Sequence, residues 1–318
     1  MDIKLIVSDI DNTILRTDGT LSPETTAAFE LAAAAGIPTV LASSRTPTIA
    51  SGLLDKVGDL RYMILLTGCR IADMKTGHRI YQRSMERSAA LELISYLESQ
   101  PDCYLEVCSD ERFLLPCAGL AYIHRIRAFE RYLHDLTPAM IEMESVSRYL
   151  AKSGAPVDKL FFYTKHRTHF LDICHGLPQQ ASIRLVSPVP NGLDVLPFGV
   201  NKGIALRFLL AQLQLLPEQV MVFGDSENDA DMFLDGTFNV AVGNAYPLLK
   251  ERASFVTRSS DEDGGQIAVC DIIGVDGAVD RPVTCETQSY CLNSDGAALC
   301  KDKFFFAEGF AISTEFLI

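Results

Sequence analysis

Apolar runs of strand length alternate with helix-length segments along the first part of the chain. Residues 4–8, 37–42 and 61–66 are such runs, and near-continuous apolar runs of this length are typical of strands covered on both faces. Between the first two runs, the sequence Ser-Pro-Glu is typical of a helix N-terminus and Gly36 of a helix end. Together they predict a helix over residues 23–35. This order of strand, helix and strand predicts a parallel sheet with right-handed crossovers.

The same alternation returns in the last third of the chain. Strands are predicted there at 192–196, 219–223, 238–242 and 255–257, with helices at 202–215 and from about residue 229 onward. Between the two blocks, helices are predicted at 86–99, 120–134 and 138–150, and strands at 104–107, 113–115, 159–163 and 182–186. The middle block therefore has the pattern of a separate α+β module.

We predict an α/β fold built from two domains and an extension. The core, residues 1–83 and 189–274, is expected to be a Rossmann-like parallel sheet with helices on both faces. Residues 84–188 are expected to form a large inserted α+β domain, with the return to the core marked by the prolines at 188 and 190. Residues 275–318 form a C-terminal extension, either an extra hairpin or a loosely held tail.

Two carboxylates follow the first strand directly. Asp9 and Asp11 lie two residues apart at its end, and ligands of open α/β sheets gather beyond the carboxyl ends of such strands. Either residue alone is explained by bonds to turn amides, which aspartates often make. Together they repel each other unless a cation or a proton separates them. The pair therefore predicts a metal site, a shared proton, or both.

A second apolar strand also ends in acidic residues. The run 220–223 leads into Gly224-Asp225-Ser226-Glu227-Asn228-Asp229, where the glycine allows a close backbone approach. Hard oxygen donors from two strand ends suit Mg²⁺, which prefers one or two carboxylates together with water and substrate phosphate. We assign the ligand role to Asp225. Asn228 and Asp229 are common helix caps, so we treat them as supporting residues.

One lysine and two serines are candidates for binding an anion. Lys202 follows Asn201, a plausible N-cap, so its ammonium group lies at the positive end of a helix, where a bound anion would offset an unfavourable charge. A solvated lysine whose stem carries the charge away is the alternative. Ser43 and Ser44 close a strand, where a hydroxyl group and backbone amides can hold phosphate oxygens. Taken alone, they are more simply interpreted as turn serines.

Composition and charge exclude several classes of protein. The 318 residues are 48% hydrophobic, which is ample for a buried core, and the net charge of −13 with no long basic run argues against a nucleic-acid partner. No apolar run is long enough to span a bilayer and the start does not resemble a secretory signal, so we expect a cytoplasmic protein without a membrane partner.

The cysteines point to the same compartment. Nine cysteines without paired short spacings predict buried thiols in a reducing environment rather than a disulfide framework. Cys285, Cys291 and Cys300 form the one loose group. Their wide, irregular spacing and the lack of a nearby histidine favour ordinary packing over zinc binding.

The order of these motifs resembles the haloacid dehalogenase (HAD) superfamily, and most closely its Cof-type branch, subfamily IIB, of sugar-phosphate and cofactor phosphatases. The resemblance covers about residues 1–274. Its markers are, in order, Asp9-Ile10-Asp11-Asn12-Thr13, Ser43, Asn201-Lys202-Gly203, Gly224-Asp225-Ser226-Glu227-Asn228-Asp229 with Met232, Val242-Gly243-Asn244-Ala245, and Asp263-Gly264. One of these motifs would be weak, but the ordered set is highly specific.

The resemblance implies a Mg²⁺-dependent phosphatase that hydrolyses small phosphorylated metabolites through an aspartyl-phosphate intermediate. It implies Asp9 as the nucleophile and Asp11 as the general acid and base. The remaining roles that it implies are phosphate binding by Ser43, Lys202 and Asn12, metal binding by Asp9, Asp11 and Asp225, and support from Ser44, Asn228 and Asp229. Asn12 replaces the usual glycine, a change that asparagine tolerates because it enters left-handed conformations readily. The inserted domain corresponds to the family's cap, which closes over the substrate and selects it.

Two other functions stay open at this point. A phosphomutase would return the phosphoryl group to another hydroxyl, and a receiver-like phospho-acceptor or binding protein would use the same residue types without turnover. The large inserted domain and the complete set of reactive residues argue against the non-enzyme. The substrate, the residues that select it, the choice between Ser43 and Ser44, and the oligomeric state do not follow from the sequence.

Overall fold

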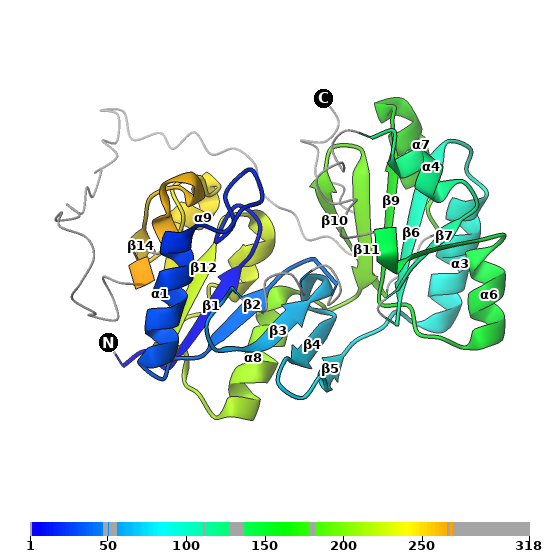
Figure 1. The fold of residues 1–318 in the computed structure, drawn as a ribbon. Coiled ribbons are helices and arrows are strands. Elements are labelled where there is room, and N and C mark those ends of the chain that lie inside the picture. The colour runs from blue at the N-terminus through cyan, green and yellow to red at the C-terminus, as the bar shows by residue number, and fades with distance from the viewer. Residues whose placement is uncertain are drawn as a thin grey trace, which may run out of the picture. The chain divides into compact units, whose positions relative to one another are not determined.

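The computed structural model describes residues 2–46, 50, 56–110, 112–126, 137–178, 182–265 and 268–269 of the chain. They all belong to one unit, Met1–Val275. The extension 275–318, with its group of cysteines, and the second half of the helix expected at 120–134 lie outside the described residues. The described residues contain an eight-stranded and a six-stranded sheet (Figure 1).

The eight-stranded sheet has the order β14-β13-β12-β1-β2-β3-β4-β5. Its strands are β1 (Leu5–Asp9), β2 (Thr39–Ala42), β3 (Leu60–Leu65), β4 (Arg70–Asp73), β5 (Arg79–Gln82), β12 (Val220–Gly224), β13 (Phe238–Ala241) and β14 (Phe255–Val256). The six strands from β14 to β3 run parallel, and β4 and β5 extend the sheet as an antiparallel hairpin. Strand β1 lies between β2 and β12, in the middle of the parallel part.

Helices pack on both faces of this sheet because successive side chains of a strand point to opposite sides. Ile6 of β1 belongs to the same apolar cluster as Phe29 of α1 (Pro23–Ala34). Leu5 belongs to a second cluster with Leu206 of α8 (Lys202–Leu213), and both clusters are buried. The short helix α9 (Pro247–Glu251) and the 3-10 helices η2 (Leu66–Gly68), η5 (Pro217–Gln219), η6 (Glu227–Met232) and η7 (Ser260–Glu262) complete this part. The predicted α/β fold with helices on both faces is confirmed.

The six-stranded sheet has the order β10-β11-β9-β6-β7-β8 and is antiparallel except between β7 and β8. Its strands are β6 (Cys103–Ser109), β7 (Arg112–Pro116), β8 (Met140–Met143), β9 (Lys159–Thr164), β10 (Ile183–Val189) and β11 (Gly192–Pro197). Its helices are α3 (Arg87–Glu98), α4 (Gly119–Ile123), α6 (Val146–Ser153) and α7 (Arg167–Gly176), and a 3-10 turn, η4, spans Thr137–Ala139. One apolar cluster joins this sheet to α3, α6 and α7, which makes it a core separate from that of the first sheet.

Buried charged groups lie on the other face of the six-stranded sheet. The Lys159 ammonium nitrogen is 2.9 Å from a carboxylate oxygen of Asp194, and the Tyr104 hydroxyl donates to Glu106 at 2.9 Å. Burial raises the pKa of Glu106 to about 7, and the charge of Lys159 and the bond from Tyr104 only partly oppose this shift.

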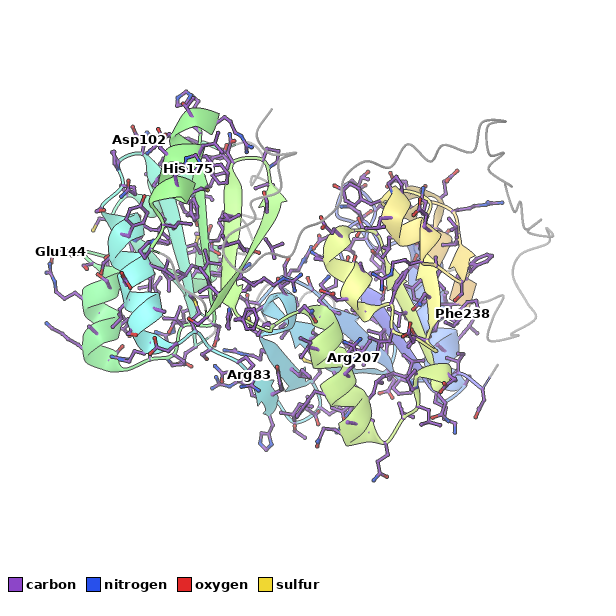
Figure 2. All side chains as sticks on the ribbon, turned by 180° about the vertical axis from the view of Figure 1, so that it is seen from behind. Arg83, Asp102, Glu144, His175, Arg207 and Phe238 are labelled. Atoms are coloured by element: carbon purple, nitrogen blue, oxygen red, sulfur yellow. The ribbon has the colours of Figure 1, made fainter. Side chains whose placement is uncertain are left out.

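A buried ion pair connects the two sheets. The Arg70 guanidinium of β4 lies 2.6 Å from the Asp158 carboxylate, which directly precedes β9, and neither side chain is exposed to solvent. Gln82 and Ser84 donate to the other carboxylate oxygen of Asp158 at 2.8 and 2.7 Å. These donors flank Arg83, labelled in Figure 2, where the chain leaves β5 toward the second sheet. Asp158 is therefore fully paired at the joint between the sheets.

Four predicted elements differ from the structure. In the described residues, the helix expected from residue 120 already ends at Ile123. The strand expected at 192–196 in the core pairs with β9 and β10, so the second sheet extends to Pro197, past the expected border at residue 188. The helix expected at 138–150 is a strand followed by a helix, because Ser145 and the distant Glu98 bind the first amides of α6 and start it at Val146. Near Asp229 the chain forms a 3-10 helix rather than an α-helix.

Candidate active site

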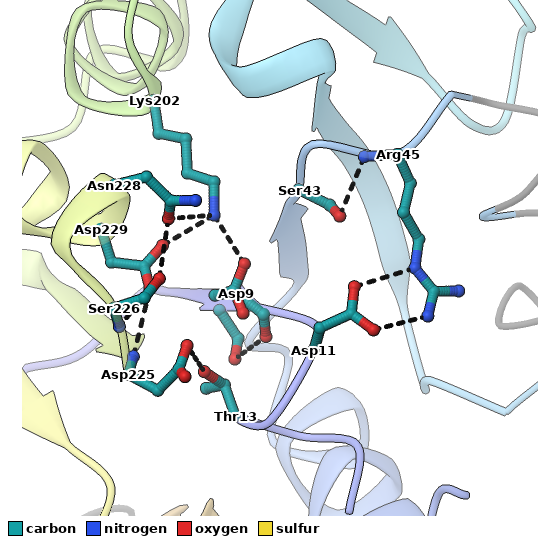
Figure 3. Close-up of polar contacts among 11 residues, drawn as sticks. Asp9, Asp11, Thr13, Ser43, Arg45, Lys202, Asp225, Ser226, Asn228 and Asp229 are labelled. Carbon is teal, nitrogen blue, oxygen red and sulfur yellow. Dashed lines mark hydrogen bonds and ion pairs between the residues drawn. The ribbon is translucent and has the colours of Figure 1, made fainter. Parts of the chain in front are cut away.

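Acidic residues from two neighbouring strands meet at one edge of the parallel sheet (Figure 3). Asp9 ends β1 and Asp225 follows β12, and because the two strands are parallel and adjacent, their carboxyl ends coincide. Asp9, Asp225 and Asp229 each offer a carboxylate oxygen, and these oxygens lie within 4.8 Å of one another. A side chain at Gly224 would place its Cβ 2.6 Å from the Cβ of Asp229, so only glycine allows this approach.

Lys202 supplies a positive charge to these acids. It is the first residue of α8 and only 1% exposed, and its ammonium nitrogen lies 2.5 Å from Asp9 Oδ1 and 2.6 Å from Asp229 Oδ1. Burial disfavours the charged form, but the Asp229 and Asp9 carboxylates outweigh it, so the pKa of Lys202 is raised. The carboxylates thus offset the unfavourable place of a cation at a helix N-terminus.

Close backbone packing fixes the start of α8. The Asn201 side chain caps the helix by accepting from the amide of Ile204 at 2.6 Å. A Cβ at Gly203 would lie 1.7 Å from the Asp231 carbonyl oxygen, and one at Gly68 would lie 2.2 Å from the Asn201 carbonyl oxygen. The position of Lys202 is therefore set by contacts with the 3-10 helices η6 and η2.

Asp229 holds the loop that carries Asp225. Its Oδ2 accepts from the amides of Asp225 and Ser226 at 3.1 and 3.0 Å and from the Ser226 hydroxyl at 3.1 Å, while Oδ1 accepts from Lys202. Asn228 Oδ1 accepts from the Ser226 hydroxyl at 3.0 Å and from Lys202 at 3.2 Å. With both of its oxygens bonded, Asp229 is a brace for the site, whereas Asp9 and Asp225 make fewer bonds.

The acids carry more negative charge than Lys202 balances. Burial and the charge of Asp229 raise the pKa of Asp9, with Lys202 acting in the opposite direction. Burial and Asp229 also raise the pKa of Asp225 to about 7, although Lys202 and a 3.3 Å hydrogen bond from the Thr13 hydroxyl lower it. A buried group of carboxylate oxygens with surplus negative charge fits a hard divalent cation such as Mg²⁺.

Asp11 lies apart from this group. Arg45 donates from Nε to Asp11 Oδ2 at 3.0 Å and from a terminal nitrogen to Oδ1 at 2.7 Å, a two-bond contact that Figure 3 shows on the far side of Asp11 from Lys202. The three acids grouped as possible metal ligands do not include Asp11, which the sequence analysis expected there. Sequence reasoning missed Arg45, although it stands two residues after Ser43 in the same strand-end turn.

Ser43 lies at the end of β2, next to Asp11 and Arg45. It is 1% exposed, its hydroxyl accepts from the Arg45 amide at 3.1 Å, and its carbonyl accepts from the Thr67 amide at 3.0 Å. Ser44 follows in the same turn and is half-buried. The turn thus brings a hydroxyl group close to the two strand-end aspartates of β1.

The turn after Asp11 is held by residues from the end of the core. Asn12 has a positive φ of 59°, the left-handed conformation expected for the residue in the glycine position. Its backbone carbonyl accepts from Nδ2 of Asn244 at 2.8 Å, and the side-chain oxygen Oδ1 of Asn244 accepts from the Ser260 amide at 2.8 Å. Asn244, which sequence analysis quoted without a role, therefore connects the β1 turn to η7.

A family model described as haloacid dehalogenase-like hydrolase matches residues 6–267. The chain belongs to this family. The resemblance inferred from the ordered motifs is therefore confirmed, and with it the prediction that the chain is an enzyme. No helix in the described parts of this hydrolase is long and apolar enough to cross a membrane.

Relatives of this hydrolase are named phosphatases. The chain is 28% identical over 280 residues to 5-amino-6-(5-phospho-D-ribitylamino)uracil phosphatase YwtE of Bacillus subtilis, covering 82% of this chain and 95% of the relative. It is 26% identical over 247 residues to HMP-PP phosphatase of Serratia proteamaculans, covering 78% and 86%. With the family match, these similarities identify the chain as a phosphoric monoester hydrolase of the HAD type.

Solved structures show the same fold. A haloacid dehalogenase-like hydrolase from Bacteroides thetaiotaomicron superposes with a TM-score of 0.74 at 22% identity, covering 85% of this chain and 99% of that chain. The HAD subclass IIB sugar phosphatase BT4131 superposes with a TM-score of 0.69 at 20% identity, covering 85% and 99%. The fold of this hydrolase therefore includes both sheets.

Proposed function

We propose that this HAD-type phosphatase hydrolyses small phosphorylated metabolites through a phosphoryl group carried by Asp9, with Mg²⁺ as its cofactor. One observation supports the proposal most: Asp9, Asp225, Asp229 and Lys202 converge at the carboxyl ends of two adjacent parallel strands. The carboxylate oxygens of Asp9 and Asp225 are the proposed metal ligands, while Asp229 braces the loop and Lys202.

The positive charges determine whether the reaction can start. A carboxylate that approaches a phosphate dianion is repelled, so the site must neutralise charge before it can position the reacting atoms. Mg²⁺ supplies such charge when it is bound. Lys202, already within 2.5 Å of Asp9, offsets the negative charge of the attacking carboxylate and favours its ionised form. Ser43, which directly follows the β2 residue paired with Asp9, is proposed to bind the phosphate with Lys202 and the Asn12 turn.

Two displacements complete the proposed turnover. An Asp9 oxygen bonds to phosphorus while the bond from phosphorus to the leaving oxygen breaks, and Asp11 gives its proton to that oxygen. A water molecule then attacks the same phosphorus, Asp11 takes one proton from the water, and the bond from phosphorus to Asp9 breaks. Inorganic phosphate leaves, and Asp9 and Asp11 return to their starting states.

The second sheet is the proposed substrate-selecting domain. We place its C-terminal border after Pro197 rather than at the expected residue 188, and the pairing of β11 with β9 and β10 supports this choice. The names of the relatives, a phosphoribitylaminouracil phosphatase and an HMP-PP phosphatase, support phosphorylated cofactor precursors or sugar phosphates as the substrate class. A panel of such esters, screened for phosphate release with Mg²⁺, identifies the preferred one.

The test of this proposal is the variant Asp9→Asn. We expect it to lose at least about 10³-fold of the Mg²⁺-dependent release of phosphate from p-nitrophenyl phosphate, because the amide is a poor nucleophile. Asp172→Asn, on α7 of the second sheet, is the matched control and should keep the full rate. Free phosphate as the product separates hydrolysis from a phosphomutase reaction. Wild-type turnover in Asp9→Asn would overturn the proposal.

A further inference from the structure

Asp11 is the one acid of the β1 end that is bound by an arginine. Arg45 meets both of its carboxylate oxygens, at 2.7 and 3.0 Å, and the two side chains are only 12% and 27% exposed. Two of the other acids at this edge, Asp9 and Asp229, are bound by Lys202 instead. The two aspartates of the β1 end, although two residues apart, therefore have different cationic partners.

The backbone of Arg45 is fixed at both ends of the residue. Its amide donates to the Ser43 hydroxyl at 3.1 Å, and its carbonyl accepts from the Leu66 amide at 3.1 Å. Leu66 and the next residue, Thr67, have positive φ angles of 53° and 56°, and Thr67 donates its amide to the Ser43 carbonyl. Left-handed backbone at a leucine and a β-branched threonine is disfavoured, and such strain persists where surrounding contacts impose it, often at functional sites. The turn that presents Arg45 is therefore held in one shape.

We propose that Arg45 is a positioning residue of the phosphatase reaction, which holds the Asp11 carboxylate away from the cation-binding acids so that it serves the leaving oxygen. This inference rests on the proposed function of Asp11 and goes beyond it, because it names the residue that separates the two aspartates. A bidentate arginine contact fixes the plane of a carboxylate as well as its position. Without it, the Asp11 carboxylate would be free to turn toward Asp9 and Asp225, the residues that would hold the cation.

The contact leaves part of each Asp11 carboxylate oxygen free to meet the substrate. Each carboxylate oxygen has two lone pairs, and the two bonds from Arg45 occupy one lone pair on each oxygen. One lone pair on each oxygen remains for a contact with the leaving oxygen of the substrate. Lysine cannot replace this geometry, because its ammonium group is a single point of charge without the planar pair of donors.

The leaving group of the substrate provides the test. The quantity kcat/KM covers the steps up to departure of the leaving group, and a proton from Asp11 matters most when that group is a basic alkoxide. For Arg45→Met we expect a loss of about 100-fold in kcat/KM with an alkyl phosphate but less than about 5-fold with p-nitrophenyl phosphate, whose leaving group needs little protonation. Arg45→Lys should show the same selective loss to a smaller extent.

Two further variants make the test specific. In the background Asp11→Asn, the change Arg45→Met should have almost no further effect on the alkyl phosphate, because residues that act through one another are not additive. Arg61→Gln removes an arginine–aspartate contact of similar length, 2.7 Å to Asp73, and should leave the ratio of the two substrates unchanged. Thermal unfolding of each variant confirms that it is folded.

The outcomes separate this inference from the proposed function. Equal losses on both substrates in the folded Arg45→Met and Arg45→Lys variants would mean that Arg45 binds phosphate or supports the fold, and would overturn the inference alone. An additive loss in the Asp11→Asn background would overturn it as well. An active Asp9→Asn variant would instead remove the proposed function on which the inference rests.

Discussion

Replacing Lys202 by methionine tests how strongly the site depends on its single buried ammonium group. Methionine keeps most of the unbranched side chain and removes the charge that lies 2.5 Å from Asp9 and 2.6 Å from Asp229. One pair of charges at 4 Å attracts by about 4 kcal/mol at an effective dielectric constant of 20, but much of this is spent on desolvating the ammonium group. Removing one partner of a buried pair costs about 3–5 kcal/mol, because the other charge stays buried and unpaired.

We therefore expect Lys202→Met to lower the free energy of unfolding by about 3–5 kcal/mol, which corresponds to a fall in Tm of roughly 6–20 °C for a protein of this size. Urea unfolding in the absence of divalent ions measures this change in the free energy of unfolding. Lys4→Met is the control, since Lys4 is 49% exposed and its 3.3 Å contact with Asp2 lies at the surface, where such pairs contribute little. Adding Asp229→Asn to Lys202→Met should restore part of the loss. A loss below about 1 kcal/mol in Lys202→Met would refute the reasoning.

Three further predictions concern the rest of the fold. Burial raises the pKa of Glu106 from 4.5 to about 7, so this group stabilises the folded state below pH 4.5, and that stability is lost as the pH rises to about 7. The free energy of unfolding of Glu106→Gln should therefore exceed that of the wild type by up to roughly 3 kcal/mol at pH 8 and equal it at pH 4. Urea unfolding at the two pH values measures this difference. Arg70→Met, which leaves the buried Asp158 carboxylate without its guanidinium, should cost about 3–5 kcal/mol, whereas Arg148→Met at an exposed ion pair should cost less than about 1 kcal/mol. Gly203→Ala should cost at least about 2 kcal/mol and reduce phosphatase activity, because its Cβ has no room beside the Asp231 carbonyl; an alanine variant as stable and active as wild type would show that the start of α8 is not packed as described.

The core of the fold could be predicted because its strands are buried on both faces. Such strands read as uninterrupted apolar runs, and β1, β2 and β12 were found from these runs to within about two residues. Helix α1 was marked by its own sequence, with Ser22 as the cap and Pro23 at its first position. Interactions between residues close in sequence determine these elements, so the local sequence is sufficient to predict them.

The elements that depend on distant partners could not be predicted. An apolar run such as 192–196 fits either sheet, and only its pairing with β9 and β10 places it in the second. The start of α6 is set by Glu98, whose carboxylate binds the amide of Val146. Contacts over such separations in sequence leave no local pattern.

The same distinction applies to the site. Asp9, Asp225 and Lys202 could be expected to meet, because two strands and one helix of a parallel sheet deliver them to the same edge. The side-chain direction of Asp11 could not, since Arg45 reaches it from the end of the neighbouring strand β2. Tertiary contacts determine which partner a side chain binds. The sequence motif shows only which side chains are present.

The most direct measurement of the central claim is to stop a single turnover of a phosphate-labelled substrate and locate the labelled phosphoryl group on the protein by peptide mass spectrometry. The account predicts that the label appears on the peptide containing Asp9, that it is removed by hydroxylamine as expected for an acyl phosphate, and that it persists longer in Asp11→Asn, where the attacking water has no base. A label on another residue, or full turnover with no labelled protein at any time point, would contradict the account.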